Sequence, residues 1–314
     1  MTTKDSNFVS CILYLHNEEA KISSFLEQVC QVMENHFQKY EIICVNDGST
    51  DRTVEEIQTY VKQSAQIPVL TLIQLSYYQG MEAAMNAGSD IAVGDFLFEF
   101  DHCKMDFAPE LILEVYLRAL QGYDVVAATP KRGIPLSSRL FYLVYNAGSQ
   151  TRTPLRQERF RVITRRAVNR VNHMNRYIPY RKAMYMNCGL KTDAIMYENK
   201  SIPSCHKGRE ERDSRSLLAF DTFIIFTDLL EKLSMFLSFL FFAILLWMFG
   251  YLVYSIFSPD RPVEGWISTM GLMSLGFFML FVMLTLIFKY LSVILNMLFR
   301  RQRYVVEEVE KLTK

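Results

Sequence analysis

The chain has 314 residues, which is enough for one sizeable α/β domain and an appended segment. Its 34 Lys and Arg residues nearly balance 33 Asp and Glu residues, so no global positive field indicates nucleic acid, and we expect no such partner. The six cysteines form no Cys-x-x-Cys pair and no zinc-like spacing, which predicts reduced thiols in a cytosol-facing protein.

Apolar β-branched runs alternate with helical periodicity from the N-terminus to about residue 130. Strands are predicted at Val9–Leu15, Ile42–Val45, Val69–Leu75, Phe96–Phe100 and Tyr123–Ala128, with one at Ala194–Tyr197 that returns to the sheet edge. Helices are predicted at Ile22–Met33, Val54–Val61, Gln79–Ile91, Pro109–Leu120 and Ser138–Ala147. This alternation favours an α/β fold with a mostly parallel, doubly wound sheet and helices on both faces.

A polar turn directly follows the apolar strand Ile42–Val45. Asn46 and Asp47 tolerate unusual backbone angles, and Gly48 allows a sharp reversal before the next helix. Asp47 is therefore expected at the carboxyl end of a parallel strand. Open α/β sheets bind their ligands at that edge.

Two long stretches near the C-terminus contain no charged residue, namely Leu233–Pro259 and Gly265–Phe288. Each is roughly 25 residues long, enough to cross a hydrocarbon core about 30 Å thick. A buried core helix is the alternative, but two such stretches in tandem argue against it. We predict a transmembrane hairpin over 233–299, with spans at about 233–257 and 265–288.

The segments around this hairpin define its orientation. Residues 216–232 crowd apolar side chains on a helical wheel, interrupted by Asp221 and Asp228, which predicts an interfacial juxtamembrane helix; an oblique third span is the alternative. Lys and Arg residues follow the second span. The positive-inside rule then predicts an integral membrane protein whose domain 1–215, tail 300–314 and both termini are cytoplasmic.

Four blocks follow the predicted strand ends in one order: His16–Glu19, Val45–Thr53, Gly80–Gly88 and Gly94–Asp101. This order resembles glycosyltransferase family 2, and within it the polyprenyl-phosphate glycosyltransferases such as dolichol-phosphate mannose synthase and its bacterial relatives with a two-helix anchor. The resemblance covers roughly residues 8–300. It implies a GT-A, Rossmann-like fold and transfer of a sugar from a nucleotide-diphosphate donor to a polyprenyl phosphate on the cytoplasmic leaflet.

The resemblance also implies a nucleotide-sugar site at the carboxyl edge of the sheet. The donor-binding residues that it implies are Tyr14, His16, Glu18, Asp47 and Gly80, and the charge of Lys104 makes that residue a further candidate for donor binding. Two of these have structural alternatives. Glu18 can be a first-turn carboxylate favoured by the helix dipole, and Asp47 can be a turn-forming side chain.

A divalent metal, Mg²⁺ or Mn²⁺, is the cofactor that the resemblance implies, with Asp101 as its ligand and Asp106 as a second carboxylate that reaches in if the loop bends. Cys103 and Met105 stand at expected ligand positions. Hard cations prefer oxygen, so these two residues weaken the metal site. Lys104 is the alternative group for neutralising the diphosphate.

For the acceptor phosphate the resemblance implies cationic side chains, namely Arg139, Arg159 and Arg161. The groups expected to act in the transfer itself are Asp101, Arg139 and Arg161. A lipid phosphate is already ionised at neutral pH, so direct displacement at the anomeric carbon needs no general base.

One alternative to this enzyme stays open, and a second is set aside. A catalytically silent relative would bind a nucleotide-sugar, a lipid phosphate or a membrane partner without turnover. A processive polysaccharide synthase would show a Gln-x-x-Arg-Trp motif, but Trp247 and Trp266 both lie in the anchor. A hairpin this small also favours assembly, either of several copies or with a membrane partner.

Overall fold

The computed structural model describes residues 4–64, 69–132, 136–148, 154–174, 180–199, 265–299 and 304–312, with isolated positions between 236 and 250. The chain divides into two compact units, of which the first is Met1–Ala219 with Arg301–Lys314 and the second is Phe220–Arg300. The predicted interfacial helix 216–232 lies outside the described residues, as does most of the predicted span 233–257.

The first unit is built around an eight-stranded sheet in the order β7-β5-β6-β4-β1-β2-β3-β8. Its strands are β1 (Asp5–Leu15), β2 (Phe37–Asn46), β3 (Leu70–Leu75), β4 (Phe96–Phe100), β5 (Val125–Pro130), β6 (Phe160–Thr164), β7 (Thr192–Tyr197) and β8 (Val306–Leu312). Its helices are α1 (Ile22–His36), α2 (Thr53–Gln63), α3 (Met81–Ile91), α4 (Glu110–Leu120), α5 (Leu136–Gly148), α6 (Arg165–Met174) and α7 (Arg181–Asn187). Only β6 and β8 run antiparallel to their neighbours among these strands. The predicted α/β fold with a mostly parallel sheet is confirmed.

Side chains alternate between the two faces of the sheet. Cys11, Leu13 and Leu15 of β1 belong to the hydrophobic core that α1 and α4 also line. On the other face α3 lies close to the strands, because a Cβ atom added at Gly88 would be 2.4 Å from Ile12 Cγ2. The absence of a side chain at Gly88 thus permits close contact between α3 and the sheet.

Strand β6 was not predicted, and it lies between β4 and β5. It pairs with both in antiparallel register, and Arg161 is the partner of Glu99 on β4. Directly opposite residues project from the same face of a sheet. This pairing therefore places an arginine and a glutamate together beneath the carboxyl edge of the parallel strands.

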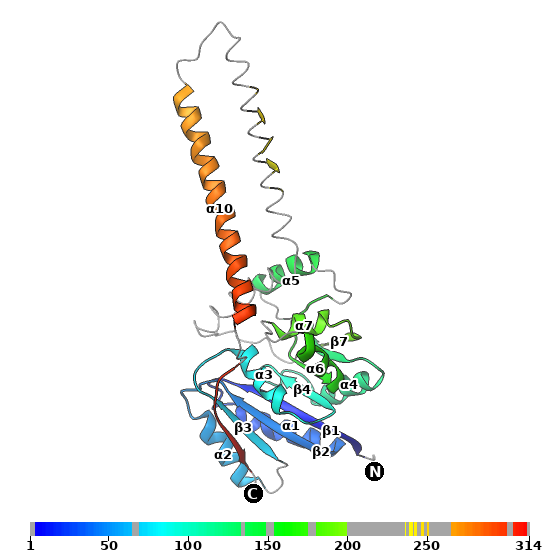
Figure 1. Cartoon of the computed structure of the whole chain (residues 1–314). Coiled ribbons are helices and arrows are strands. Elements are labelled where there is room, and N and C mark those ends of the chain that lie inside the picture. The colour runs from blue at the N-terminus through cyan, green and yellow to red at the C-terminus, as the bar shows by residue number, and fades with distance from the viewer. Residues whose placement is uncertain are drawn as a thin grey trace. The chain divides into compact units, whose positions relative to one another are not determined.

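The C-terminal strand β8 was not predicted either, and it pairs with β3 at the sheet edge (Figure 1). Just before it, the Val305 carbonyl accepts hydrogen bonds from the Gln79 side chain at 2.7 Å and from Ser76 N at 3.3 Å. Val305 N donates to Gln79 Oε1 at 2.8 Å. Tyr304 donates to Asp90 at 3.0 Å. The tail is thus bonded to the loop between β3 and α3.

In the second unit, helix α10 (Gly265–Phe299) contains the whole of the second predicted span. Large apolar side chains along it are exposed, such as Phe278 at 66% and Phe281 at 62%. Within the part of the chain that the structure describes, no helix meets both the length and the apolarity required to cross a membrane. The transmembrane hairpin stays a prediction.

Deleting residues 304–314 should lower the free energy of unfolding of the first unit by about 1–3 kcal/mol, because the β3 edge and Gln79 lose their backbone partners. Denaturant melts followed by circular dichroism measure this change. A chain ending at Leu312 retains all of β8 and is the matched control. Equal midpoints for the deletion and the control would contradict a stabilising role for β8.

Candidate functional site

Asp47 is the centre of a hydrogen-bonded cluster at the ends of β1 and β2. Its carboxylate accepts from Gln79 N at 2.7 Å, from Gly80 N at 2.9 Å and from Tyr14 Oη at 3.1 Å. The His16 ring lies 2.7 Å from the Asp47 carbonyl oxygen. The structure therefore brings together four residues that the sequence assigned to donor binding, and Asp47 fixes the backbone at the start of α3.

Burial raises the pKa of the Asp47 carboxyl, while the hydrogen bonds from Gln79, Tyr14 and Gly80 oppose that rise. Gly80 sits at the N-cap of α3 with φ +90°, a backbone conformation that glycine adopts without strain. A side chain at this position would strain the turn that Asp47 holds.

The other two predicted donor residues have different surroundings. Glu18 lies just before α1, where its backbone N donates to Thr53 Oγ1 at 2.9 Å and its carboxylate pairs with Lys21 at 2.7 Å. Lys104 is half-buried in the loop after β4. No hydrogen bond or ion pair from Lys104 to another described residue is present. The roles of Glu18 and Lys104 in donor binding stay predictions.

Each carboxylate of the loop after β4 has its own arginine. Arg161 Nη2 donates to both oxygens of Asp101, at 3.0 and 3.2 Å. Arg159 makes a two-point contact with Asp106 at 2.7 and 3.2 Å, and Tyr197 Oη adds a third bond at 2.9 Å. The predicted metal ligands and two of the predicted phosphate-binding arginines therefore meet as ion pairs.

This donor set does not fit a hard divalent cation. Cys103 is buried, its thiol points to the Tyr14 carbonyl oxygen at 3.8 Å, and burial raises its pKa well above the ordinary thiol value. Asp101 and Asp106 already compensate guanidinium charge. Among the described residues, no three His, Cys, Asp or Glu side chains form a cluster that could hold a metal ion. Mg²⁺ and Mn²⁺ require several oxygen ligands, and the described residues of this loop do not supply them.

Behind Asp101 lies a buried ionic network that the sequence analysis missed. Arg161 also contacts Glu99 at 3.6 Å and Glu158 at 3.1 Å. Arg181 of α7 pairs with Glu99, and Lys182 pairs with Glu158 at 3.4 Å. Its members come from β4, β6, α7 and the segment before β6, so spacing along the sequence gives no sign of it.

Burial alone would lower the pKa of Arg161, but Asp101, Glu158 and Glu82 raise it above its ordinary value. Burial raises the pKa of Glu82, and Arg181 opposes that rise. Arg161 therefore stays charged, and the ion pairs of the network join three carboxylates, Asp101, Glu99 and Glu158, to three cations, Arg161, Arg181 and Lys182.

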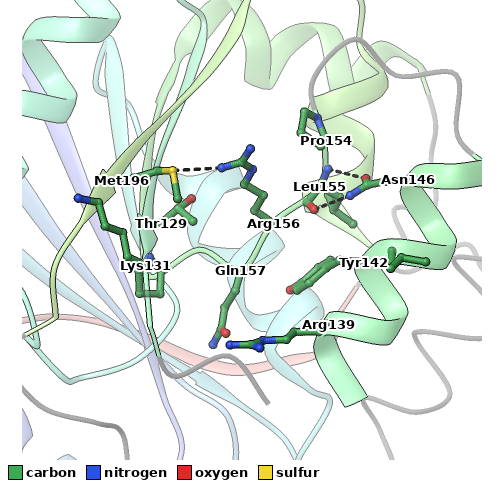
Figure 2. Close-up of a pocket in the computed structure, with 12 residues that line it drawn as sticks. Thr129, Lys131, Arg139, Tyr142, Asn146, Pro154, Leu155, Arg156, Gln157 and Met196 are labelled. Carbon is green, nitrogen blue, oxygen red and sulfur yellow. Dashed lines mark hydrogen bonds between the residues drawn. The ribbon is translucent and has the colours of Figure 1, made fainter. Parts of the chain in front are cut away.

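A cavity of about 350 Å³ opens between the ends of β5 and β7 and helix α5 (Figure 2). Figure 2 shows Lys131 and Met196 on one side, with Tyr142 and Asn146 on the other. Arg139 and Arg156 also line it, and none of its 12 described lining residues is acidic. A basic cavity of this size suits an anionic group with an attached organic part.

Of the three predicted acceptor-phosphate residues, Arg139 lines the cavity. Arg159 and Arg161 do not line it, and they pair with Asp106 and Asp101 instead. Arg139 is exposed, and it contacts no carboxylate among the described residues. The sequence analysis did not identify Lys131 and Arg156 as residues of the same site. Lys131 directly follows β5, and a basic residue at a strand end was the sequence feature that could have indicated it.

Residues 10–175 match the family described as Glycosyl transferase family 2. An uncharacterized glycosyltransferase of Synechocystis is 27% identical over 198 residues, which are 61% of this chain and 61% of that protein. One from Bacillus subtilis is 25% identical over 95% of this chain and 93% of its own length. An undecaprenyl-phosphate 4-deoxy-4-formamido-L-arabinose transferase of Aeromonas hydrophila is 33% identical over 40% of this chain and 38% of its own length.

Among solved structures, a mannosyltransferase of Pyrobaculum calidifontis in complex with GDP-Man and Mn²⁺ aligns with a TM-score of 0.48 and 17% identity. The alignment covers 68% of this chain and 61% of that chain.

Replacing Asp47 by Ala should lower the free energy of unfolding by about 2–4 kcal/mol, because two backbone N–H groups and the Tyr14 hydroxyl lose their acceptor. Asp51→Ala, in the same turn, removes the acceptor of Thr53 N, the Thr53 hydroxyl and Glu19 N. Asp51 is only half-buried, whereas Asp47 is fully buried, so water can replace the lost acceptor and the change should cost about 1 kcal/mol. Chemical denaturation of both variants measures the difference. A smaller loss for Asp47→Ala than for Asp51→Ala would show that Asp47 does not hold the loop.

Proposed function

Because the chain belongs to glycosyltransferase family 2, we propose that it transfers a sugar from a nucleotide-diphosphate donor to a polyprenyl phosphate at the cytoplasmic face of a membrane. The family membership makes the chain a glycosyltransferase with a GT-A, Rossmann-like sheet. The named activity of the Aeromonas hydrophila relative supports a polyprenyl-phosphate acceptor. That match spans less than half of either chain, so the acceptor is part of the proposal.

The observation that carries the acceptor assignment is the basic cavity beside β5. A phosphate monoester carries about −1.5 to −2 charges at neutral pH. Lys131, Arg139 and Arg156 supply positive charge there. Within the described part of the chain, Lys131 is the one of the three that pairs with a carboxylate, that of Glu198 at 3.8 Å. Tyr142 and Leu143 add apolar surface for the carbon atoms next to the phosphate.

The proposed reaction is a single displacement. An oxygen of the lipid phosphate forms a bond to the anomeric carbon, the bond from that carbon to the diphosphate oxygen breaks, and the electron pair leaves with the nucleoside diphosphate. The attacking oxygen is already ionised, so no side chain needs to remove a proton. Arg139 would orient the acceptor phosphate, and the backbone held by Asp47 would position the donor.

We assign the membrane anchor to the hairpin 233–299. Two charge-free stretches in the sequence and the exposed apolar side chains of α10 support this assignment. The basic residues after α10 support a cytoplasmic tail. Recovery of the full chain in the soluble fraction after alkaline extraction of membranes would contradict the assignment.

A catalytically silent relative is the second candidate, and the ion pairs of Asp101 and Asp106 favour it. Carboxylates that are already neutralised cannot bind a metal without breaking those pairs. Such a protein would bind a nucleotide-sugar or a lipid phosphate and transfer nothing.

Mass spectrometry of lipid products separates these two candidates. The purified full chain is incubated with a polyprenyl phosphate and a panel of nucleotide sugars, with heat-treated protein as the control. The proposal predicts one glycosylated polyprenyl phosphate and an equal amount of released nucleoside diphosphate. Donor binding with neither product would establish the silent relative instead.

Arg139→Ala should raise the KM for the lipid acceptor about tenfold or more, because a charge-assisted hydrogen bond to phosphate is lost. The KM for the nucleotide sugar should stay within about twofold. Arg170→Ala, which removes an exposed arginine from α6, is the matched control. A larger effect on the donor than on the acceptor would move Arg139 to the donor site.

A further inference from the structure

Arg161 occupies the position of a counter-ion for Asp101. One guanidinium nitrogen contacts both carboxylate oxygens, at 3.0 and 3.2 Å, and the two side chains are 5% and 12% exposed. Charge-assisted hydrogen bonds of this kind are short and directional. Arg161, on the neighbouring strand β6, therefore neutralises the Asp101 carboxylate in the absence of any ligand.

Arg161 is itself held in place. Its Nε lies 3.1 Å from Glu158 and its Nη1 lies 3.6 Å from Glu99. Two cations of α7 pair with the same glutamates, Arg181 with Glu99 and Lys182 with Glu158. Turning Arg161 away from Asp101 would leave a buried carboxylate without its counter-charge, so the pair is part of the folded structure.

A bound nucleoside diphosphate carries about three negative charges, and a free Asp101 beside it would repel it. In a metal-dependent site a divalent cation removes that repulsion. Among the described residues, too few oxygen ligands are available for such a cation, since Cys103 is buried and Asp106 is bound by Arg159 and Tyr197. Lys104 is the cation of the same loop that no described carboxylate neutralises.

We propose that this chain binds nucleoside diphosphates without a divalent metal, with Arg161 as the fixed counter-ion of Asp101 and Lys104 as the cation for the diphosphate. The inference rests on the proposed function, because it specifies how the same donor site balances charge. Arg161 acts through Asp101 and is a positioning residue, whereas Lys104 contacts the ligand.

The test is calorimetric titration of the purified full chain with UDP, GDP, CDP and TDP, each in EDTA and in Mn²⁺. The proposal predicts that at least one diphosphate binds in EDTA and that Mn²⁺ changes its Kd by less than about threefold. Binding that appears only with Mn²⁺ would overturn this inference and leave the proposed function intact. No binding of any diphosphate in either buffer would overturn both.

The response of the Kd to Mn²⁺ in variants separates the proposed role of Arg161 from a purely structural one, because a structural role would not alter this response. Arg161→Gln frees Asp101, so the Kd in EDTA should rise at least tenfold and Mn²⁺ should partly restore affinity. Arg165→Gln is the matched control, because the Arg165 side chain bonds the carbonyl oxygens of Ala92 and Gly94 and pairs with no carboxylate among the described residues. Its metal response should equal that of the native chain.

Asp101→Asn provides a second route if Arg161→Gln does not fold. It removes the negative charge, so the proposal predicts an unchanged or lower Kd in EDTA and no response to Mn²⁺. A metal-ligating Asp101 gives the opposite result, with binding lost in both buffers. Lys104→Met should weaken binding about tenfold in EDTA, and an unchanged Kd would contradict the role of Lys104.

Discussion

The charged centre of the domain depends on the contact between Arg161 and the carboxylates around it. Asp101 stands at the end of β4, Glu99 lies on the same strand, and Glu158 precedes β6, so one guanidinium ties these segments together. A buried arginine in such surroundings stays charged, and removal of one partner leaves an uncompensated charge in the interior. The carboxyl edge of the sheet is therefore organised by ion pairs within the chain and needs no bound ligand to form.

A second constraint acts on the loop between β3 and α3. From one side Asp47 accepts the N–H groups of Gln79 and Gly80, and from the other side Val305 bonds the Gln79 side chain. The start of α3 is thus held by a strand end of the sheet and by the C-terminal segment. Groups fixed before a ligand arrives lose less entropy on binding, which suits a site that must position a donor.

The sequence predicts the parallel strands and their helices well, because β-branched runs and 3.6-residue periodicity are local signals. It does not predict β6, since a strand with Arg161 in its centre resembles a solvated one, and its partner Glu99 lies far away in the chain. Strand β8 carries three glutamates and pairs at an edge, so its pattern is that of an exposed tail.

The same distinction applies to the site. Asp47 was predictable because a parallel strand ends there, and Tyr14 and His16 were implied by the family resemblance. The ion pairs of Arg159 and Arg161 were not predictable, because they depend on which acid lies across the sheet. The most direct test of the account is a structure of the full chain with a bound nucleoside diphosphate and Mn²⁺, examined for anomalous scattering. We predict that Arg161 remains bonded to Asp101 and that no manganese peak lies within about 2.6 Å of that carboxylate. A manganese ion on Asp101, with Arg161 turned away, would contradict it.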